Sequence, residues 1–245
     1  MIPNPAVRIT ESLLRLLYPE RCQLCGDQPA SRAEGFVCAA CQGSVRWIER
    51  PLCERCGLPF EGDLKHAFEC PNCVEGDFAF GRARAVFVAS GAGRELVHRY
   101  KYHRAFWFEP LFDRWVRRQS LPEPPGQGWS GIVPVPLHPV KRREREFNQA
   151  ERLARLLGAA LGLPVRADLV RRHAPTGTQT RLSRKARAAN VRRAFGSASD
   201  ADLSGTRWIV ADDVFTTGAT TDAVARILRG RGADAVDVWT LARGI

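Results

Sequence analysis

The sequence lacks any apolar run long enough to cross a membrane. A spanning helix needs about 20 consecutive apolar residues, and no stretch of the 245 residues approaches that length. The N-terminus also lacks a basic segment followed by an uninterrupted apolar one, which is the pattern of a secretory signal. We therefore expect neither a membrane-spanning nor a secreted protein.

Two common phosphate-binding motifs are also missing. A Walker loop needs a Gly-Lys-Ser/Thr, and a dinucleotide fingerprint needs three spaced glycines before a helix. Neither occurs in the sequence. Their absence excludes the P-loop and Rossmann dinucleotide modes of binding phosphate.

Lysine is scarce although the chain is basic. The chain carries 37 lysines and arginines and a net charge of +11, which favours polyanionic partners such as nucleic acid, phosphates or pyrophosphate. So strong an arginine bias can equally reflect coding composition, so the charge alone is weak evidence. The lysines are Lys65, Lys101, Lys141 and Lys185.

No cysteine follows Cys73, and this asymmetry marks a domain boundary. The cysteines form four Cys-x-x-Cys pairs, each able to give two thiolates to one tetrahedral zinc ion. We expect two structural Zn2+ ions whose four thiolates leave no open position for catalysis. Disulfides are the alternative, disfavoured because no signal peptide leads the chain to an oxidising compartment. The metal-binding residues are Cys22, Cys25, Cys38, Cys41, Cys53, Cys56, Cys70 and Cys73.

Two pairings of these motifs remain open. Sequential pairing, the first four cysteines and then the last four, gives two stacked ribbons, whereas alternating pairing gives an interleaved brace. We favour stacked ribbons over residues 21–80. Residues 1–20 are expected to form an amphipathic helix that docks on the neighbouring domain, with attachment to a membrane surface as the alternative.

The run from Ile209 to Thr221 is the most informative stretch. An apolar strand over 208–211 leads into Asp212 and Asp213, and residues 222–229 have helical spacing. A turn that opens a helix presents unpaired N–H groups and the positive end of the helix dipole, so it favours an anion. The expected phosphate loop is Thr216, Thr217, Gly218, Ala219 and Thr220.

Two carboxylates beside such a loop would repel a bare phosphate. They make sense if hydroxyl groups or a divalent cation lie between the acids and the phosphate, and ribose hydroxyls meet that requirement. The plainer alternative is a strand that ends in two solvated acids. Strands expected over 83–89, 131–136 and 234–241 alternate with helical segments, which indicates a parallel α/β sheet with the ligand above its carboxyl edge.

Two further segments invite more than one interpretation. The basic run 138–147 lies where a pyrophosphate loop belongs, but a solvated face is an equal alternative. Residues 176–195 are polar and basic, which suggests a lid that orders on an anionic ligand. A solvated loop and helix is the alternative there.

The acid pair with its Thr/Gly loop resembles the signature of type I phosphoribosyltransferases. That resemblance implies that Asp212 and Asp213 hold the 2′ and 3′ hydroxyls of phosphoribosyl pyrophosphate (PRPP), used with Mg2+, and that the loop holds the 5′-phosphate. Those relatives that salvage purines often carry an acid at the position of Thr216, so a purine acceptor is disfavoured. Lys101, Arg184 and Arg187 are hypothesised to meet pyrophosphate.

Taken with the ribbons, Tyr100-Lys101-Tyr102, the segment 133–138 and the segment 179–190, the chain resembles the ComF family over nearly its full length. The resemblance implies an α/β, parallel-sheet type I phosphoribosyltransferase fold over 81–245, preceded by the double zinc ribbon. It also implies a cytoplasmic role in DNA uptake during natural transformation, free or peripheral at the inner face of the membrane. The expected partners are PRPP, single-stranded DNA and proteins of the competence machinery. The alternative is an active enzyme that transfers ribose 5-phosphate from PRPP to a nitrogen nucleophile.

Overall fold

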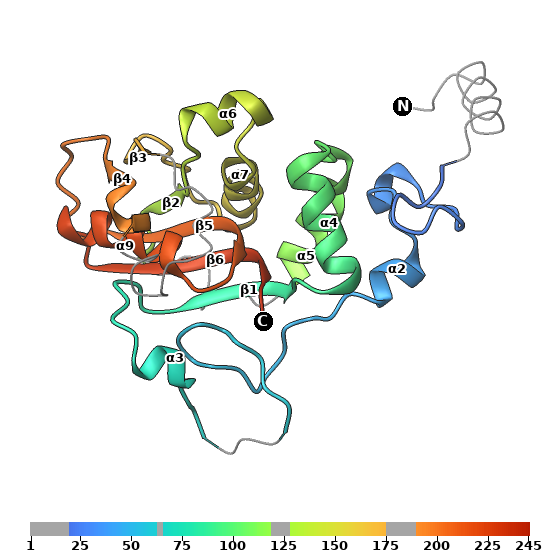
Figure 1. Ribbon diagram of the computed structural model, residues 1–245, viewed down its shortest axis with the longest axis horizontal. Coiled ribbons are helices and arrows are strands. Elements are labelled where there is room, and N and C mark those ends of the chain that lie inside the picture. The colour runs from blue at the N-terminus through green and yellow to red at the C-terminus, as the bar shows by residue number, and fades with distance from the viewer. Residues whose placement is uncertain (1–19, 63–65, 119–127, 175–189) are drawn as a thin grey trace.

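Four parallel strands form the centre of the molecule. The computed structural model describes residues 20–62, 66–118, 128–174 and 190–245. The strands β1 (Ala83–Val88), β2 (Gly131–Pro134), β5 (Arg207–Phe215) and β6 (Ala235–Arg243) lie in the order β1-β6-β5-β2 (Figure 1). Every pairing within this sheet is parallel, so the expected α/β architecture is confirmed.

Both faces of the sheet are covered, because successive side chains of a buried parallel strand supply opposite cores. In β5, Ile209 and Ala211 join one hydrophobic core, whereas Trp208 and Val210 join the other. The first core includes α4 (Gly91–Tyr102), α5 (Glu109–Arg118) and α7 (Gln149–Leu161). The second includes α9 (Ala219–Gly230) and the antiparallel hairpin of β3 (Val170–Arg172) and β4 (Phe195–Ser197).

Local sequence explains where these helices begin. Asn148 caps α7 by accepting a hydrogen bond from the N–H of Ala150 at 3.1 Å, as expected of an Asn at this position. The 3-10 turn η2 (Phe106–Phe108) leads directly into α5. The basic run 138–147 differs from the expected loop: Pro139 opens the short helix α6 (Pro139–Arg145), and His138 caps it. Proline is favoured in the first helical turn because the missing N–H is not needed there.

Two small cysteine units precede the sheet. The first carries η1 (Arg32–Glu34) and α2 (Ala39–Gly43), and the second carries α3 (Pro71–Val74). The segment between them lies along the outer edge of β1, where Trp47 forms an antiparallel bridge with Phe87. The edge of the sheet is thereby covered.

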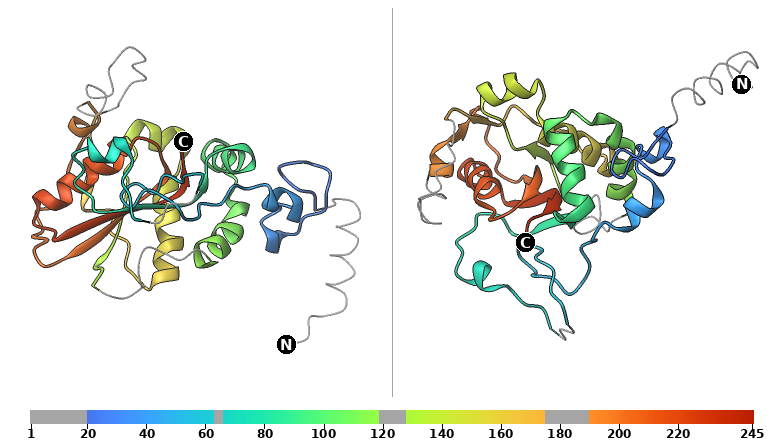
Figure 2. Two further views of the ribbon diagram at one scale, coloured as in Figure 1. Left: turned by 90° about the horizontal axis from the view of Figure 1, so that it is seen from below. Right: turned by 45° about the vertical axis from the view of Figure 1, so that its right-hand side comes forward.

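The two cysteine units do not stack on each other. Cys22 and Cys38 belong to the core shared with α4, α5 and α7, whereas Cys53 and Cys70 belong to the core shared with α9. Figure 2 shows the two units at separate places beside the sheet. The expected stacking is therefore wrong, because each unit buries its apolar side chains against the α/β part and not against the other unit.

No helix within the described ranges is both long and apolar enough to span a bilayer. The expected helix over 1–20 lies outside the described residues, apart from Glu20.

Candidate functional site

The cysteines form two groups of four, paired in sequence order. Within each group the four sulfur atoms lie within 4.8 Å of one another, with 3.9 Å between the Sγ atoms of Cys25 and Cys38 and 3.7 Å between those of Cys56 and Cys70. Tetrahedral coordination at the usual Zn–S length of about 2.3 Å places sulfurs about 3.8 Å apart. Both groups therefore fit a structural Zn2+, and the sequential pairing is confirmed. The groups are Cys22, Cys25, Cys38 and Cys41, then Cys53, Cys56, Cys70 and Cys73.

Backbone N–H groups point at the sulfurs in both knuckles. Cys38 N lies 3.3 Å from Cys22 Sγ, and Cys70 N lies 3.3 Å from Cys53 Sγ. These bonds favour the thiolate form that a metal requires. Burial works against the charge at Cys22, but the donated hydrogen bonds outweigh it and lower the pKa of that thiol to about 6.

The acid pair lies at the carboxyl edge of the sheet. Strand β5 continues past the expected end at 211 and carries Asp212 and Asp213 within its last residues. Asp213 is 3% exposed, and Asp212 is partly exposed. Since β5 is central in the sheet, neighbouring strands flank both acids.

Lys101 from α4, predicted from the sequence to meet pyrophosphate, pairs with one acid of this pair. Its Nζ is 2.8 Å from Asp213 Oδ2, and its side chain is 24% exposed. Burial opposes the charge of Lys101, but the carboxylates of Asp213 and Asp212 outweigh that effect and raise its pKa. Lys101 thus forms an ion pair with Asp213 and lies near Asp212.

Asp212 is left without a full counter-charge. Burial and the adjacent charge of Asp213 raise its pKa to about 8. A carboxyl with so raised a pKa favours a ligand that supplies hydroxyl groups or a cation. Holding two acids together in a largely enclosed place has an energetic cost.

Arg172 of β3 is a nearby residue that the sequence did not single out. Burial lowers the pKa of its guanidinium, while the charge of Asp212 acts in the opposite direction, so the two groups lie close enough to interact electrostatically. Its guanidinium also lies over the Phe195 ring, 5.2 Å from the ring centre. The hairpin of β3 and β4 brings it there, and no local motif in the sequence marks it.

The loop after β5 has the expected form. Thr216 and Thr217 are exposed, Gly218 has φ +80°, and α9 begins at Ala219 with no side chain capping its N-terminus. The carbonyl oxygens turn inward: Gly218 O accepts from Asp222 N at 2.8 Å and from the Thr221 hydroxyl at 3.0 Å.

The N–H groups of this loop are available to a ligand. Among the described residues, no protein acceptor is found for the N–H of Thr217 or of Gly218. A Cβ at Gly218 would lie 2.7 Å from the Phe215 ring, so glycine is required both for its φ and for this close approach. Uncapped N–H groups at the start of a twelve-residue helix fit a phosphate.

The basic residues of α6 are mostly held by neighbours. Lys141 pairs with Glu144 at 2.8 Å, and Arg142 lies 3.7 Å from Glu151. The guanidinium of Arg145 lies over the ring of Tyr102, 5.0 Å from the ring centre, and Tyr102 is the residue that follows Lys101. Its Nη1 is buried with no hydrogen-bond partner among the described residues, so Arg145 is the member of this run best placed for an anion.

Arg184 and Arg187, expected to meet pyrophosphate, lie outside the described residues, as does most of the proposed lid over 176–195.

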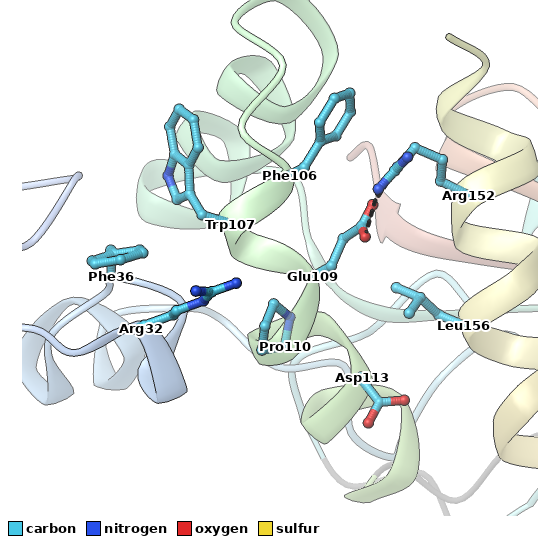
Figure 3. A pocket seen from close by; sticks show the side chains of 9 residues that line it. All are labelled: Arg32, Phe36, Phe106, Trp107, Glu109, Pro110, Asp113, Arg152 and Leu156. Carbon is cyan, nitrogen blue, oxygen red and sulfur yellow. Dashed lines mark hydrogen bonds and ion pairs between the residues drawn. The ribbon is translucent and has the colours of Figure 1, made fainter. Parts of the chain in front are cut away.

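A hollow lined by other residues than the acid pair lies between the first cysteine unit and the helices α5 and α7 (Figure 3). Its volume is about 730 Å3. Aromatic side chains line it, and Trp107 is 40% exposed. Both lining carboxylates are already paired: Glu109 to Arg152 at 2.8 Å and Asp113 to Arg117 at 2.9 Å. The lining residues are Arg32, Phe36, Phe106, Trp107, Glu109, Pro110, Asp113, Arg152 and Leu156.

Comparison with known proteins gives matches over most of the chain. The double zinc ribbon domain matches residues 13–74. Competence protein F of Haemophilus influenzae is 29% identical over 222 residues, which cover 86% of this chain and 92% of that protein. The DNA utilization protein YhgH of Escherichia coli is 29% identical over 232 residues, with 93% and 99% covered. Competence protein ComFC of Bacillus subtilis is 25% identical over 214 residues, with 84% of each covered.

These matches agree with the paired cysteine groups and the parallel sheet, and the names of the relatives support a role in competence and DNA uptake. The chain is similar over most of its length to competence protein F, YhgH and ComFC, which confirms its resemblance to the ComF family.

Proposed function

We propose that this protein binds PRPP at the carboxyl edge of β5 and acts in DNA uptake by handling incoming single-stranded DNA. The observation that carries the PRPP half is the order of groups along one edge: two largely enclosed acids, an exposed Thr-Thr-Gly turn and an uncapped helix start. Acids bind hydroxyls and N–H groups bind phosphate, so a phosphorylated ribose is complementary to the whole edge.

Each residue has a separate task in this proposal. Asp212 and Asp213 accept hydrogen bonds from the 2′ and 3′ hydroxyls and fix the orientation of the ribose. The 5′-phosphate accepts hydrogen bonds from N–H groups and hydroxyls of residues Thr216 to Thr220, in place of water. Lys101 limits the repulsion between the two acids and, with Arg145 beside Tyr102, presents positive charge toward pyrophosphate.

The residues present also fit Mg2+ carried with PRPP. Lys101 forms an ion pair with one of the two acids, Asp213, at 2.8 Å, and carboxylate oxygens are ligands that Mg2+ prefers. Bound to the pyrophosphate, Mg2+ would neutralise charge that grows as the pyrophosphate departs. The protein itself contributes the orientation of the ribose and the fixed donors.

The hollow drawn in Figure 3 favours the single-stranded DNA half of the proposal. Single strands bind where bases can stack on aromatic side chains next to arginine. Phe36, Phe106 and the exposed Trp107 supply the aromatic surface. Since both lining acids are paired, Arg32 is the lining charge that has no ion pair among the described residues, and it can meet a phosphate.

The alternative is an enzyme that transfers ribose 5-phosphate from PRPP to a nitrogen nucleophile, for which the same edge of the sheet would serve. A paired titration separates the two: PRPP and a labelled oligonucleotide are added separately and in competition. The proposal expects both to bind, with oligonucleotide binding weakened by salt. Release of pyrophosphate from PRPP on addition of an amine or base would favour the enzyme, and oligonucleotide binding that does not change with salt would contradict the DNA half.

A further inference from the structure

Arg243 connects the second cysteine group to the loop after β5. It lies at the end of β6 and is 7% exposed. Its Nε donates to Cys56 O at 3.3 Å, and its Nη1 donates to Thr216 O at 2.8 Å and to Phe215 O at 3.2 Å. A guanidinium is rigid and planar, so one group fixes the position of the loop relative to the cysteine knuckle.

The same side chain also faces the metal ligands. Its Nη2 lies 3.7 Å from Cys56 Sγ, and within the described ranges no carboxylate pairs with it. A buried cation needs a compensating charge. Four thiolates around one Zn2+ carry a net negative charge, so the loaded site supplies that compensation, and neutral thiols would not.

The packing between the two sites is also shared. A cavity of about 330 Å3 extends between Cys73 of the second group and Thr216 and Thr217 of the loop. The Phe215 ring lies 4.8 Å below the Arg243 guanidinium, and Gly218 packs against that ring. Ala79, just after the second cysteine unit, donates its N–H to Asp222 of α9 at 2.8 Å. A change in the knuckle is therefore transmitted to the loop and to the first turn of α9.

The first cysteine group has, among the described residues, no side chain that joins it directly to the loop after β5. Its backbone is held by Arg99 of α4, which donates to Gln23 O, and by Arg114 of α5, which donates to Ala33 O. Its cysteines belong to the core on the other face of the sheet. It thus provides an internal comparison for the second group.

We propose that zinc at Cys53, Cys56, Cys70 and Cys73 and phosphoribosyl ligand at the loop stabilise each other through Arg243, a positioning residue, whereas zinc in the first group does not respond to that ligand. The inference rests on the proposed function, because the ligand that zinc in the second group is expected to influence is the one proposed to bind this loop. Linkage requires the effect to be reciprocal: a ligand that holds the loop slows zinc loss, and zinc loss weakens the ligand.

The experiment follows zinc release from the full chain to a chromogenic chelator, with and without PRPP and Mg2+. Two zinc equivalents are expected, and PRPP should slow the release of one of them by roughly tenfold, within the usual range of coupling between sites. Arg243→Met should speed release of that equivalent, remove its protection by PRPP and weaken PRPP binding, measured by calorimetry. Arg243→Lys keeps the charge and should retain part of the effect.

Arg114→Met is the matched control, because it removes an arginine-to-carbonyl contact from the first unit. It should leave the PRPP-protected equivalent unchanged. Equal protection of both zinc equivalents, or release from Arg243→Met at the wild-type rate, would overturn the inference while leaving PRPP binding intact. Failure of the wild-type chain to bind PRPP would instead overturn the proposed function, and with it the ligand half of the inference.

Discussion

The ammonium of Lys101 lies 2.8 Å from the carboxylate of Asp213, so α4 and β5 meet at a largely buried ion pair at the carboxyl edge of the sheet. The contact joins the helix that follows the first strand to the strand that carries the acid pair. The charge balance of this edge depends on it.

Breaking the Lys101–Asp213 pair should be costly, and removing both partners should cost less than the two single losses added together. Lys101→Met leaves a buried carboxylate uncompensated, so we expect a loss of about 1–3 kcal/mol in the free energy of unfolding, since Lys101 is itself partly exposed. Asp213→Asn should also destabilise. In denaturant unfolding, the double variant should lose about 1 kcal/mol less than the sum of the single losses. Strict additivity would show that the pair does not interact.

The raised pKa of Asp212 predicts a stability that falls as pH rises. Its pKa of about 8 in the fold exceeds the value of about 3.9 in an unfolded chain. The stabilising contribution is therefore complete below the unfolded value and is lost as pH rises through the folded one. Asp212→Asn cannot ionise at this position. Its free energy of unfolding, relative to that of the wild type, should therefore increase by about 2–3 kcal/mol as the pH is raised from about 6 to about 9.

Denaturant unfolding at both pH values checks this prediction. Asp200→Asn is the control, because the Asp200 side chain is fully exposed. It should gain nothing over the same interval. An Asp212→Asn advantage that is constant with pH would show that this carboxyl does not have a raised pKa.

Gly218 should tolerate no side chain. Its φ is +80°, and a Cβ would lie 2.7 Å from the Phe215 ring. Gly205, with φ +73° and no atom within 4 Å of the place that a Cβ would take, isolates the backbone strain. We expect Gly205→Ala to cost about 1 kcal/mol and Gly218→Ala to cost more and to weaken PRPP binding at least tenfold. Equal effects of the two changes on PRPP binding would remove the loop from the site.

Trp107 and Arg32 should contribute to the binding of single strands. Trp107→Ala should cost about 1–3 kcal/mol of oligonucleotide affinity, since it removes a stacking surface. Arg32→Ala should make the slope of the logarithm of the binding constant against the logarithm of the salt concentration less steep by about 0.7, which is the contribution of one phosphate contact on a single strand. Fluorescence anisotropy across a salt series measures both. Arg50→Ala, at a side chain that is 74% exposed and does not line the hollow, is the control, and a loss equal to that of Arg32→Ala would argue for nonspecific charge.

Features carried by one segment could be predicted from the sequence. The four cysteine pairs, the strand before Asp212 and the helix after Gly218 each depend on neighbouring residues, and the structure places them as expected. The helix over 139–145 was missed because the density of charge in that run suggested a loop, although Pro139 and His138 form a recognisable helix start.

Features that join distant segments could not be predicted. Arg243 meets Cys56 across 187 positions of sequence, and the charge of Asp212 acts on Arg172, which lies in a hairpin with strands of only three residues. The distribution of the two cysteine units over separate cores also depends on the assembled sheet. Local spacing contains no information on which face a unit will cover.

The most direct test of the central claim is calorimetric titration of PRPP with Mg2+ into the wild-type chain and into the double variant Asp212→Asn/Asp213→Asn. We predict saturable binding to the wild type and its loss in the double variant, with both zinc ions retained. No binding to the wild type at millimolar PRPP, or equal binding to the two proteins, would contradict a phosphoribosyl site at this edge of the sheet.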